Sequence, residues 1–264
     1  SCVEMGSRRT HEEAAVAAAR AAYLAGFAST SNLEAGRRYG IPTIGTAAHS
    51  FTLLFDTEEE AFGAQLHTLG ESTTLLVDTY DVEKAIRLAV ELTEGRLGAV
   101  RLDSGDLPIM ARQARDLLDD LGATSTRIMV TSDLDEWQIA MLQGAPVDGY
   151  GVGTSLVTGS GHPTCGFVYK LVARASSTGA EMIPVGKRKN TLGGRKFAMR
   201  RIGPDGAEAE VIGLGAPPVN DGNDRDLLVP IFRGGELVYT ATLDDGRRRH
   251  DESLRVLPLA ARRI

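Results

Sequence analysis

The sequence predicts an α/β protein, a (β/α) barrel followed by a β-rich C-terminal domain. In the first 155 residues, short apolar strands alternate with amphipathic helices, and this alternation implies parallel strands joined by right-handed crossovers. Seven such strand segments in a row favour a closed barrel over an open sheet. After about residue 159 helical periodicity becomes scarce, which predicts a second domain of a different kind.

Seven segments have the length and apolar content of strands: residues 2–5, 26–29, 42–46, 73–78, 99–103, 127–131 and 149–152. Helices are predicted between them at residues 11–24, 57–69, 82–92, 108–121 and 134–143. Thr10 with Glu13 has the spacing of a capping box, and Ser132 or Asp133 can cap the last helix. We therefore predict an α/β-barrel catalytic domain over residues 1–160.

The C-terminal part, residues 161–264, is predicted to be a separate antiparallel β-rich domain. A loop rich in glycine at residues 158–163 precedes it. The predicted strands are residues 166–173, 196–202, 209–214, 227–232 and 236–242. Turn signals at residues 203–206 and at Gly234-Gly235 join two pairs of these segments as hairpins.

The composition restricts the partners. A net charge of −6 argues against a nucleic-acid partner, which requires a concentrated positive field. No apolar run reaches the length of a membrane span, and Cys2 and Cys165 are too few for a disulfide framework. We therefore expect a cytoplasmic protein. The chain starts within a predicted strand at Ser1, so we also expect it to be a piece of a longer protein, truncated on the N-terminal side.

Polar residues follow nearly every predicted strand, at the end of a barrel where active sites are built. Gly151-Val152-Gly153-Thr154 comes after the last strand and predicts a phosphate site, because glycine lets an anion approach the backbone N–H groups. A glycine-rich turn without a ligand is the alternative. Ser132 and Asp133 follow the preceding strand and are further candidates for substrate binding.

Charged residues gather at the neighbouring strand ends. Arg101 and Asp103 are two apart, so their side chains share one face of their strand, and Asp78 ends the preceding predicted strand. An ion pair with a structural role is one interpretation. The other is a site for a cationic partner, either Mg²⁺ chelated by a polyphosphate near Asp78 or a sugar carbon that gains positive charge. His49 follows another strand among small residues that leave room for a bulky anion.

A basic cluster surrounds Gly193-Gly194. It contains Lys187, Arg188, Lys189, Arg195 and Lys196. A solvated loop is the more ordinary interpretation of such a cluster. The alternative is a flexible basic lid that reaches a diphosphate.

Several motifs, in this order, resemble those of the nicotinate phosphoribosyltransferases. They are residues 26–32, 40–42, 45–50, 76–81, 101–106, 132–136 and 151–154, followed by 168–172. The resemblance covers nearly the whole predicted barrel and is looser in the C-terminal part. It implies a barrel of the type II phosphoribosyltransferase kind, a homodimer, and the formation of nicotinate mononucleotide and diphosphate from nicotinate and phosphoribosyl diphosphate. It also implies ATP as a co-substrate and Mg²⁺.

The resemblance assigns roles residue by residue. His49 would be the transiently phosphorylated histidine that couples ATP hydrolysis. Asp78 and Asp103 would flank the ribose and the Mg²⁺-diphosphate with Arg101 nearby, and Gly153 and Thr154 would bind the 5′-phosphate. Arg8 and Ser31 would face the pyridine ring and its carboxylate. A serine at position 31 favours nicotinate over nicotinamide, because an acidic residue there would repel a carboxylate.

The sequence departs from the family in two places. Met5 stands where the family commonly has an aromatic residue, so a thioether, which can also pack on an aromatic face, replaces a ring on that side. The family also has an N-terminal region ahead of this motif, and that region helps to build the substrate site. Two alternatives therefore stay open: an enzyme of the same fold that uses nicotinamide or quinolinate, and a non-catalytic fragment that binds a phosphorylated ligand.

Overall fold

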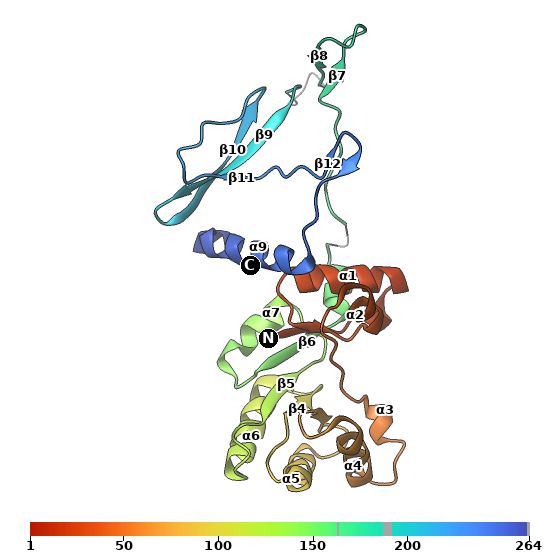
Figure 1. Ribbon diagram of the computed structural model, residues 1–264. Helices are drawn as coiled ribbons and strands as arrows, with labels where there is room; N and C mark the ends of the chain where they lie inside the picture. The colour runs from red at the N-terminus through yellow and green to blue at the C-terminus, as the bar shows by residue number, and fades with distance from the viewer. Residues whose placement is uncertain (163, 187–191, 263–264) are drawn as a thin grey trace. The chain divides into compact units, whose positions relative to one another are not determined.

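A parallel sheet of six strands forms the centre of the N-terminal unit (Figure 1). The structure is a computed structural model that describes residues 1–162, 164–186 and 192–262. The chain divides into two compact units, Ser1–Thr164 and Cys165–Ile264.

The strand order in the sheet is β2-β1-β6-β5-β4-β3, and all of these pairs are parallel. The strands are β1 Cys2–Glu4, β2 Ser29–Thr30, β3 Thr74–Leu76, β4 Ala99–Leu102, β5 Arg127–Val130 and β6 Gly149–Val152. The first strand lies between the second and the last, since Val3 pairs with both Ser29 and Gly151. Among the described residues the edge strands β2 and β3 do not pair with each other, so the sheet is an open half-barrel.

Helices connect the strands. They are α1 Glu12–Leu24, α2 Leu33–Tyr39, α3 His49–Thr52, α4 Glu58–Leu69, α5 Val82–Thr93, α6 Leu107–Asp120, α7 Glu136–Met141 and α8 Thr154–Thr158, with short 3₁₀ turns η1 Ser7–Arg9 and η2 Leu142–Gly144. Side chains define several starts: Asp81 accepts from the Lys84 N–H at 2.9 Å to cap α5, and Asn32 caps α2. A left-handed glycine, Gly40, ends α2.

The core of this unit lies between the sheet and the apolar faces of α5 and α6. In α6 the buried residues Leu107, Ala111, Ala114 and Leu118 recur at helical spacing. They pack in one cluster with strand residues such as Val100 and Ile128, which are fully buried. This core fixes the strands, and therefore the loops that follow their carboxyl ends.

Several local predictions were wrong. Residues 42–46 form no strand; Thr43 makes only an isolated bridge to Thr30, and Pro42 has no N–H to donate to a ladder. The first helix is capped by the His11 side chain, which accepts from Glu13 N at 3.3 Å, instead of by Thr10. The cap of α7 is Asp135, which accepts from Gln138 N at 2.8 Å, instead of Ser132 or Asp133.

The described residues of the C-terminal unit form three small antiparallel sheets. Its strands are β7 Ala173–Ala175, β8 Met182–Pro184, β9 Lys196–Gly203, β10 Gly206–Leu214, β11 Arg225–Asp226, β12 Phe232–Arg233 and β13 Glu236–Leu237. Both predicted hairpins are confirmed, since β9 pairs with β10 and β12 pairs with β13 across the expected turns. The long helix α9 Leu243–Val256 was not predicted, although Thr242 and Asp245 form a capping box at its start. A 3₁₀ turn, η3 Leu259–Arg262, follows it.

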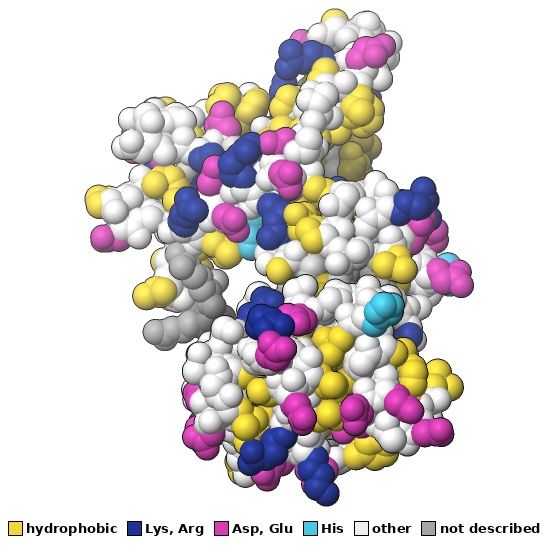
Figure 2. Space-filling view, turned by 60° about the horizontal axis from the view of Figure 1, so that its bottom comes forward, with side chains coloured by type: hydrophobic (Ala, Val, Ile, Leu, Met, Phe, Trp, Pro, Cys, Tyr) yellow, Lys and Arg dark blue, Asp and Glu magenta, His cyan; other side chains and the backbone are white. Residues whose placement is uncertain are grey.

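The surface carries charges of both signs. On the face drawn in Figure 2, the basic side chains of the described residues are interspersed with acidic ones. No helix in the described part of the chain combines the length and apolar character that a membrane span requires.

Candidate functional site

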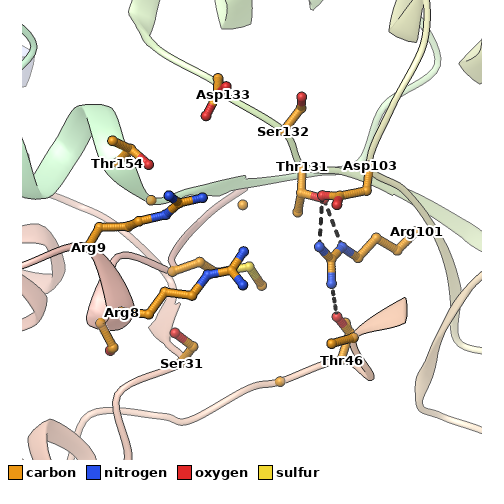
Figure 3. A pocket seen from close by; sticks show the side chains of 16 residues that line it. Arg8, Arg9, Ser31, Thr46, Arg101, Asp103, Thr131, Ser132, Asp133 and Thr154 are labelled. Carbon is orange, nitrogen blue, oxygen red and sulfur yellow. Dashed lines mark hydrogen bonds and ion pairs between the residues drawn. The ribbon is translucent and has the colours of Figure 1, made fainter. Parts of the chain in front are cut away.

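A cavity of about 480 Å³ opens at the carboxyl ends of the strands in the N-terminal unit. Figure 3 shows the 16 residues that line it. They come from β4 and β6, from the segments after β1, β2, β4, β5 and β6, and from the loop before α3: Met5, Ser7, Arg8, Arg9, Ser31, Gly45, Thr46, Ala48, Arg101, Asp103, Thr131, Ser132, Asp133, Gly151, Gly153 and Thr154. The cavity is therefore at the end of the sheet where an α/β barrel places its chemistry.

One wall of the cavity is a hydrogen-bonded network around Arg101. Its Nη2 donates to Asp103 Oδ1 at 2.8 Å, and its Nε donates to Thr131 Oγ1 at 2.8 Å. Its Nη1 donates to Thr46 Oγ1 at 2.5 Å and to the Ala47 carbonyl at 3.4 Å. The guanidinium thus joins β4, the end of β5 and the loop before α3 (Figure 3), and most of its donors are used within the protein.

The same network controls the charge of Asp103. Burial alone would raise the pKa of this carboxyl group, but the hydrogen bond from Thr131 and the adjacent Arg101 guanidinium outweigh it, so the pKa lies below its ordinary value. Asp103 therefore stays ionised at neutral pH and presents a fixed negative charge to the cavity.

Asp78 and His49 lie next to this wall without lining the cavity. His49 is the first residue of α3, and its Nε2 lies 3.1 Å from Asp78 Oδ1. The other Asp78 oxygen accepts from Asp103 N at 2.7 Å and from Ser104 Oγ at 2.9 Å. The Asp78 side chain is almost completely buried whereas that of His49 is 41% exposed, so a buried carboxylate orients an accessible imidazole.

The opposite side of the cavity is cationic. Arg8 and Arg9 are exposed, lie in the 3₁₀ turn η1 after β1, and extend into the cavity in Figure 3. Within the described residues neither guanidinium has a hydrogen-bond or ion-pair partner. Thr154 lies beside Arg9, and Ser31 lies beside Arg8. Two unpaired cations next to hydroxyl groups make this side suited to an anion.

The two glycines of the predicted phosphate loop are required by close packing. A Cβ at position 151 would lie 2.5 Å from Thr131 Cγ2, and one at position 153 would lie 2.9 Å from the Met5 carbonyl oxygen. Ser132, which follows β5, has φ +121°. This backbone conformation is unfavourable for any residue with a Cβ and costs free energy. Such strain is characteristic of functional sites.

The structure brings nearly all the sequence-predicted residues together. Nine of them line the cavity: Arg8, Ser31, Arg101, Asp103, Ser132, Asp133, Gly151, Gly153 and Thr154. The other two, His49 and Asp78, are linked to its wall. Arg9, Thr46 and Thr131 were not assigned a role from sequence. Arg9 and Thr46 had a signal in the sequence, because each is a polar residue at the end of a predicted strand or just after one.

The described residues do not test two further predictions, the Mg²⁺ that diphosphate would chelate and the basic lid. Among these residues no three His, Cys, Asp or Glu side chains gather as a metal site. Three residues of the basic cluster, Lys187, Arg188 and Lys189, lie outside the described residues.

The sequence has well-matched relatives. A nicotinate phosphoribosyltransferase of Mycobacterium tuberculosis is 53% identical over 97% of this chain, which spans 59% of that protein. The chain is homologous to the nicotinate phosphoribosyltransferases. The enzyme of that name from Bacillus subtilis is 39% identical over 87% of this chain and 49% of its own length. The chain thus spans about half to three fifths of the length of these two relatives. No family model matches the chain.

Two solved structures share the fold of this chain. The human nicotinic acid phosphoribosyltransferase superposes with a TM-score of 0.78 at 26% identity, over 99% of this chain and 66% of that one. A nicotinate-nucleotide pyrophosphorylase of Pyrococcus furiosus superposes with a TM-score of 0.77 at 22% identity, over 96% of this chain and 65% of that one. The second likeness shows the fold alone.

Proposed function

We propose that this chain carries the catalytic site of a nicotinate phosphoribosyltransferase, which joins nicotinate to the ribose of phosphoribosyl diphosphate and releases diphosphate. The observation that carries the proposal is the polarity of the cavity. Arg8 and Arg9 are unpaired among the described residues on one side, and an ionised Asp103 is held on the other. Homology to enzymes of that name over 97% of the chain supports it.

This polarity fits the reaction. The bond from the anomeric carbon to diphosphate breaks as the bond to the pyridine nitrogen forms, and positive charge develops on the ribose in an oxocarbenium-like state. Asp103 and Asp78 would stabilise that charge. Gly151, Gly153 and Thr154 would bind the 5′-phosphate, with Ser132 and Asp133 on the ribose side. Arg8 and Ser31 would bind the nicotinate carboxylate, and Arg9 would supply a second cation.

ATP would act by transferring its terminal phosphoryl group to His49, and ADP would leave. We propose that the His49 imidazole accepts a phosphoryl group, because it is accessible and Asp78 holds its Nε2. Mg²⁺ usually binds through one or two carboxylates together with substrate phosphates. Asp78 already accepts three hydrogen bonds. In the described part of the chain it also belongs to no group of three or more Asp, Glu, His or Cys side chains that could hold a metal ion. The ion would therefore take most of its ligands from diphosphate and water, where it would neutralise the leaving group.

The larger assembly is also part of the proposal. We propose that residues 1–160 belong to a closed barrel of the type II phosphoribosyltransferase kind, that residues 161–264 form a β-rich domain, and that the protein is a cytoplasmic homodimer. The TM-score of 0.78 to the human enzyme supports the barrel. Size-exclusion chromatography with light scattering would test the dimer, and a monomeric mass would contradict it.

The identity of the pyridine substrate is tested by comparing nicotinate, nicotinamide and quinolinate in parallel assays. Product formation from phosphoribosyl diphosphate should be highest with nicotinate and at least about tenfold lower with nicotinamide or quinolinate, because a hydroxyl and an arginine complement one carboxylate. A preference for nicotinamide would contradict the role of Ser31.

Binding is tested by calorimetry. Phosphoribosyl diphosphate should bind the wild type, and Arg9→Ala should weaken its binding by about tenfold or more, whereas Arg8→Ala should weaken nicotinate binding by a similar factor, since each removes a charge-assisted hydrogen bond. Arg87→Ala is the matched control, because Arg87 pairs with Glu83 on α5 away from the cavity. Binding without turnover would favour the alternative of a non-catalytic phosphate-binding protein.

A further inference from the structure

A buried carboxylate lies beneath the cationic side of the cavity. Glu4 is the last residue of β1 and is fully buried. Both of its carboxyl oxygens accept hydrogen bonds, Oε1 from Gly6 N at 2.5 Å and Oε2 from Thr30 Oγ1 at 2.5 Å. Both oxygens of the buried side chain therefore have a hydrogen-bond partner within the protein. A charged group that is fully buried costs free energy unless it is well paired, so its place beneath a substrate cavity requires an explanation.

The hydrogen bonds of Glu4 form part of a closed ring. Thr30 Oγ1, which donates to Glu4, accepts from Asn32 N at 2.9 Å. Asn32 Nδ2 in turn donates to Ser7 Oγ at 3.0 Å. Ser7 follows Gly6 in the chain, and Gly6 N donates to Glu4, which closes the ring. The ring therefore ties the turn after β1 to the segment after β2.

These two segments carry the cavity residues that face an anion. The turn after β1 presents Arg8 and Arg9, and the segment after β2 presents Ser31. The backbone of Ser31 is also tied to Glu4, because Ser31 N donates to the Glu4 carbonyl at 2.8 Å. The Glu4 side chain itself is not among the residues that line the cavity. Its influence on a ligand is therefore indirect.

We propose that Glu4 is a positioning residue for substrate binding, which sets the spacing of Arg8 and Arg9 from Ser31 through the ring of Thr30, Asn32, Ser7 and Gly6. The expected effect on KM rests on the proposed function. The expected effect on structure, a turn after β1 that is fixed without any ligand, does not depend on that function. If the ring fixes the turn in the unliganded protein, the arginines are held in place before an anion arrives, and less ordering is required on binding.

The first test is Glu4→Gln, which keeps the shape of the side chain and removes its charge. The glutamine oxygen can still accept from Gly6 N, and its amide can donate to Thr30 Oγ1, so the fold is retained while the charge-assisted bonds are lost. The KM values for nicotinate and phosphoribosyl diphosphate should rise by about tenfold, with kcat within about threefold. Unchanged KM values, or a fall in kcat alone, would overturn the proposal.

A matched pair at position 30 separates positioning from packing. Thr30→Val removes the hydroxyl that donates to Glu4 and should raise both KM values, whereas Thr30→Ser keeps the hydroxyl and should leave them within about twofold. Gln65→Leu is the control for a general loss of stability. Gln65 is also a buried polar residue, but it bonds to Thr73 and Thr74 at the amino end of β3. It should lower Tm and leave both KM values unchanged.

Hydrogen exchange distinguishes failure of this proposal from failure of the proposed function. In Glu4→Gln the amide hydrogens of residues 6–9 should exchange about tenfold faster than in the wild type, in the absence of any ligand. In Gln65→Leu their exchange should not change. If the wild type makes no nicotinate mononucleotide, the proposed function fails and this measurement still decides the role of Glu4. Unchanged exchange at residues 6–9 would overturn it.

Discussion

Arg101 and Asp103 form an ion pair in which Nη2 lies 2.8 Å from Oδ1, and Thr131 bonds to both partners. The side chains of the pair are only 14% and 26% exposed. Arg101 also donates to Thr46 in the loop that leads to His49. The pair therefore connects the carboxylate of the cavity to the segment that carries the accessible histidine.

Replacing Arg101 should cost stability because its planar guanidinium bonds to three separate segments. Arg101→Lys keeps the charge but cannot reproduce this geometry. We expect the free energy of unfolding to fall by about 1–3 kcal/mol, measured by chemical denaturation. Arg87→Lys is the control, since the exposed pair of Arg87 with Glu83 should contribute less than about 1 kcal/mol. An equal loss in the two variants would contradict the structural role of Arg101.

The pKa of Asp103 should depend on Thr131. Because the folded pKa lies below the ordinary value of 3.8, the stability that Asp103 contributes is present above about pH 3.8 and is lost as the pH falls through the lower folded pKa. Thr131→Val removes a hydrogen bond that lowers this pKa, so the folded pKa should rise, and the stability that Asp103 contributes should be smaller and should be fully lost at a higher pH. Thr131→Ser should keep the low pKa. A carbon-13 NMR titration of the Asp103 carboxyl measures it, and identical curves for the two variants would contradict the assignment.

ATP stimulation should depend on His49. In the proposed coupling its imidazole carries the phosphoryl group, so His49→Ala should abolish both ATP stimulation and phosphohistidine, detected by mass spectrometry. Asp78→Asn should weaken both, because Asp78 holds His49 Nε2. His67→Ala, at the end of α4, should leave both unchanged. Stimulation by ATP that survives in His49→Ala would rule out the coupling.

Strain at Ser132 should be measurable as stability. At φ +121° a glycine has no Cβ penalty, so Ser132→Gly should raise the free energy of unfolding by about 1 kcal/mol. Ser132→Ala keeps the Cβ and should not. If Ser132 also contacts the ribose, both variants should raise the KM for phosphoribosyl diphosphate. A destabilised Ser132→Gly would show that the backbone is not strained.

The sequence predicted which residues line the cavity better than it predicted the hydrogen bonds that join them. Residues after strands could be found because the carboxyl ends of parallel strands meet at one edge, and this rule located Arg8, Asp103 and Thr154 in one cavity. Thr131 was missed because a threonine within a strand pattern reads as core. The ring through Glu4 joins residues 26 positions apart, a contact that periodicity does not reveal.

The limits of the fold prediction have similar causes. Helix α2 was missed because it has only seven residues, although Asn32 and Gly40 mark its two ends. The strand predicted at residues 42–46 was wrong. The prediction relied on the apolar content of the segment and did not consider that Pro42 has no N–H to donate to a neighbouring strand. Helix α9 was missed because it is mostly polar and buries none of its residues, so no apolar periodicity marks it.

The central claim is that this cavity forms nicotinate mononucleotide, and direct quantification of that product tests it. Nicotinate, phosphoribosyl diphosphate, ATP and Mg²⁺ are incubated with the protein, and the product is measured by mass spectrometry. We expect steady turnover in the wild type, a loss of at least about 100-fold in Asp103→Asn, and no change in Asp116→Asn on α6 away from the cavity. A folded wild-type protein that makes no nicotinate mononucleotide, or an Asp103→Asn variant as active as the wild type, would contradict the claim.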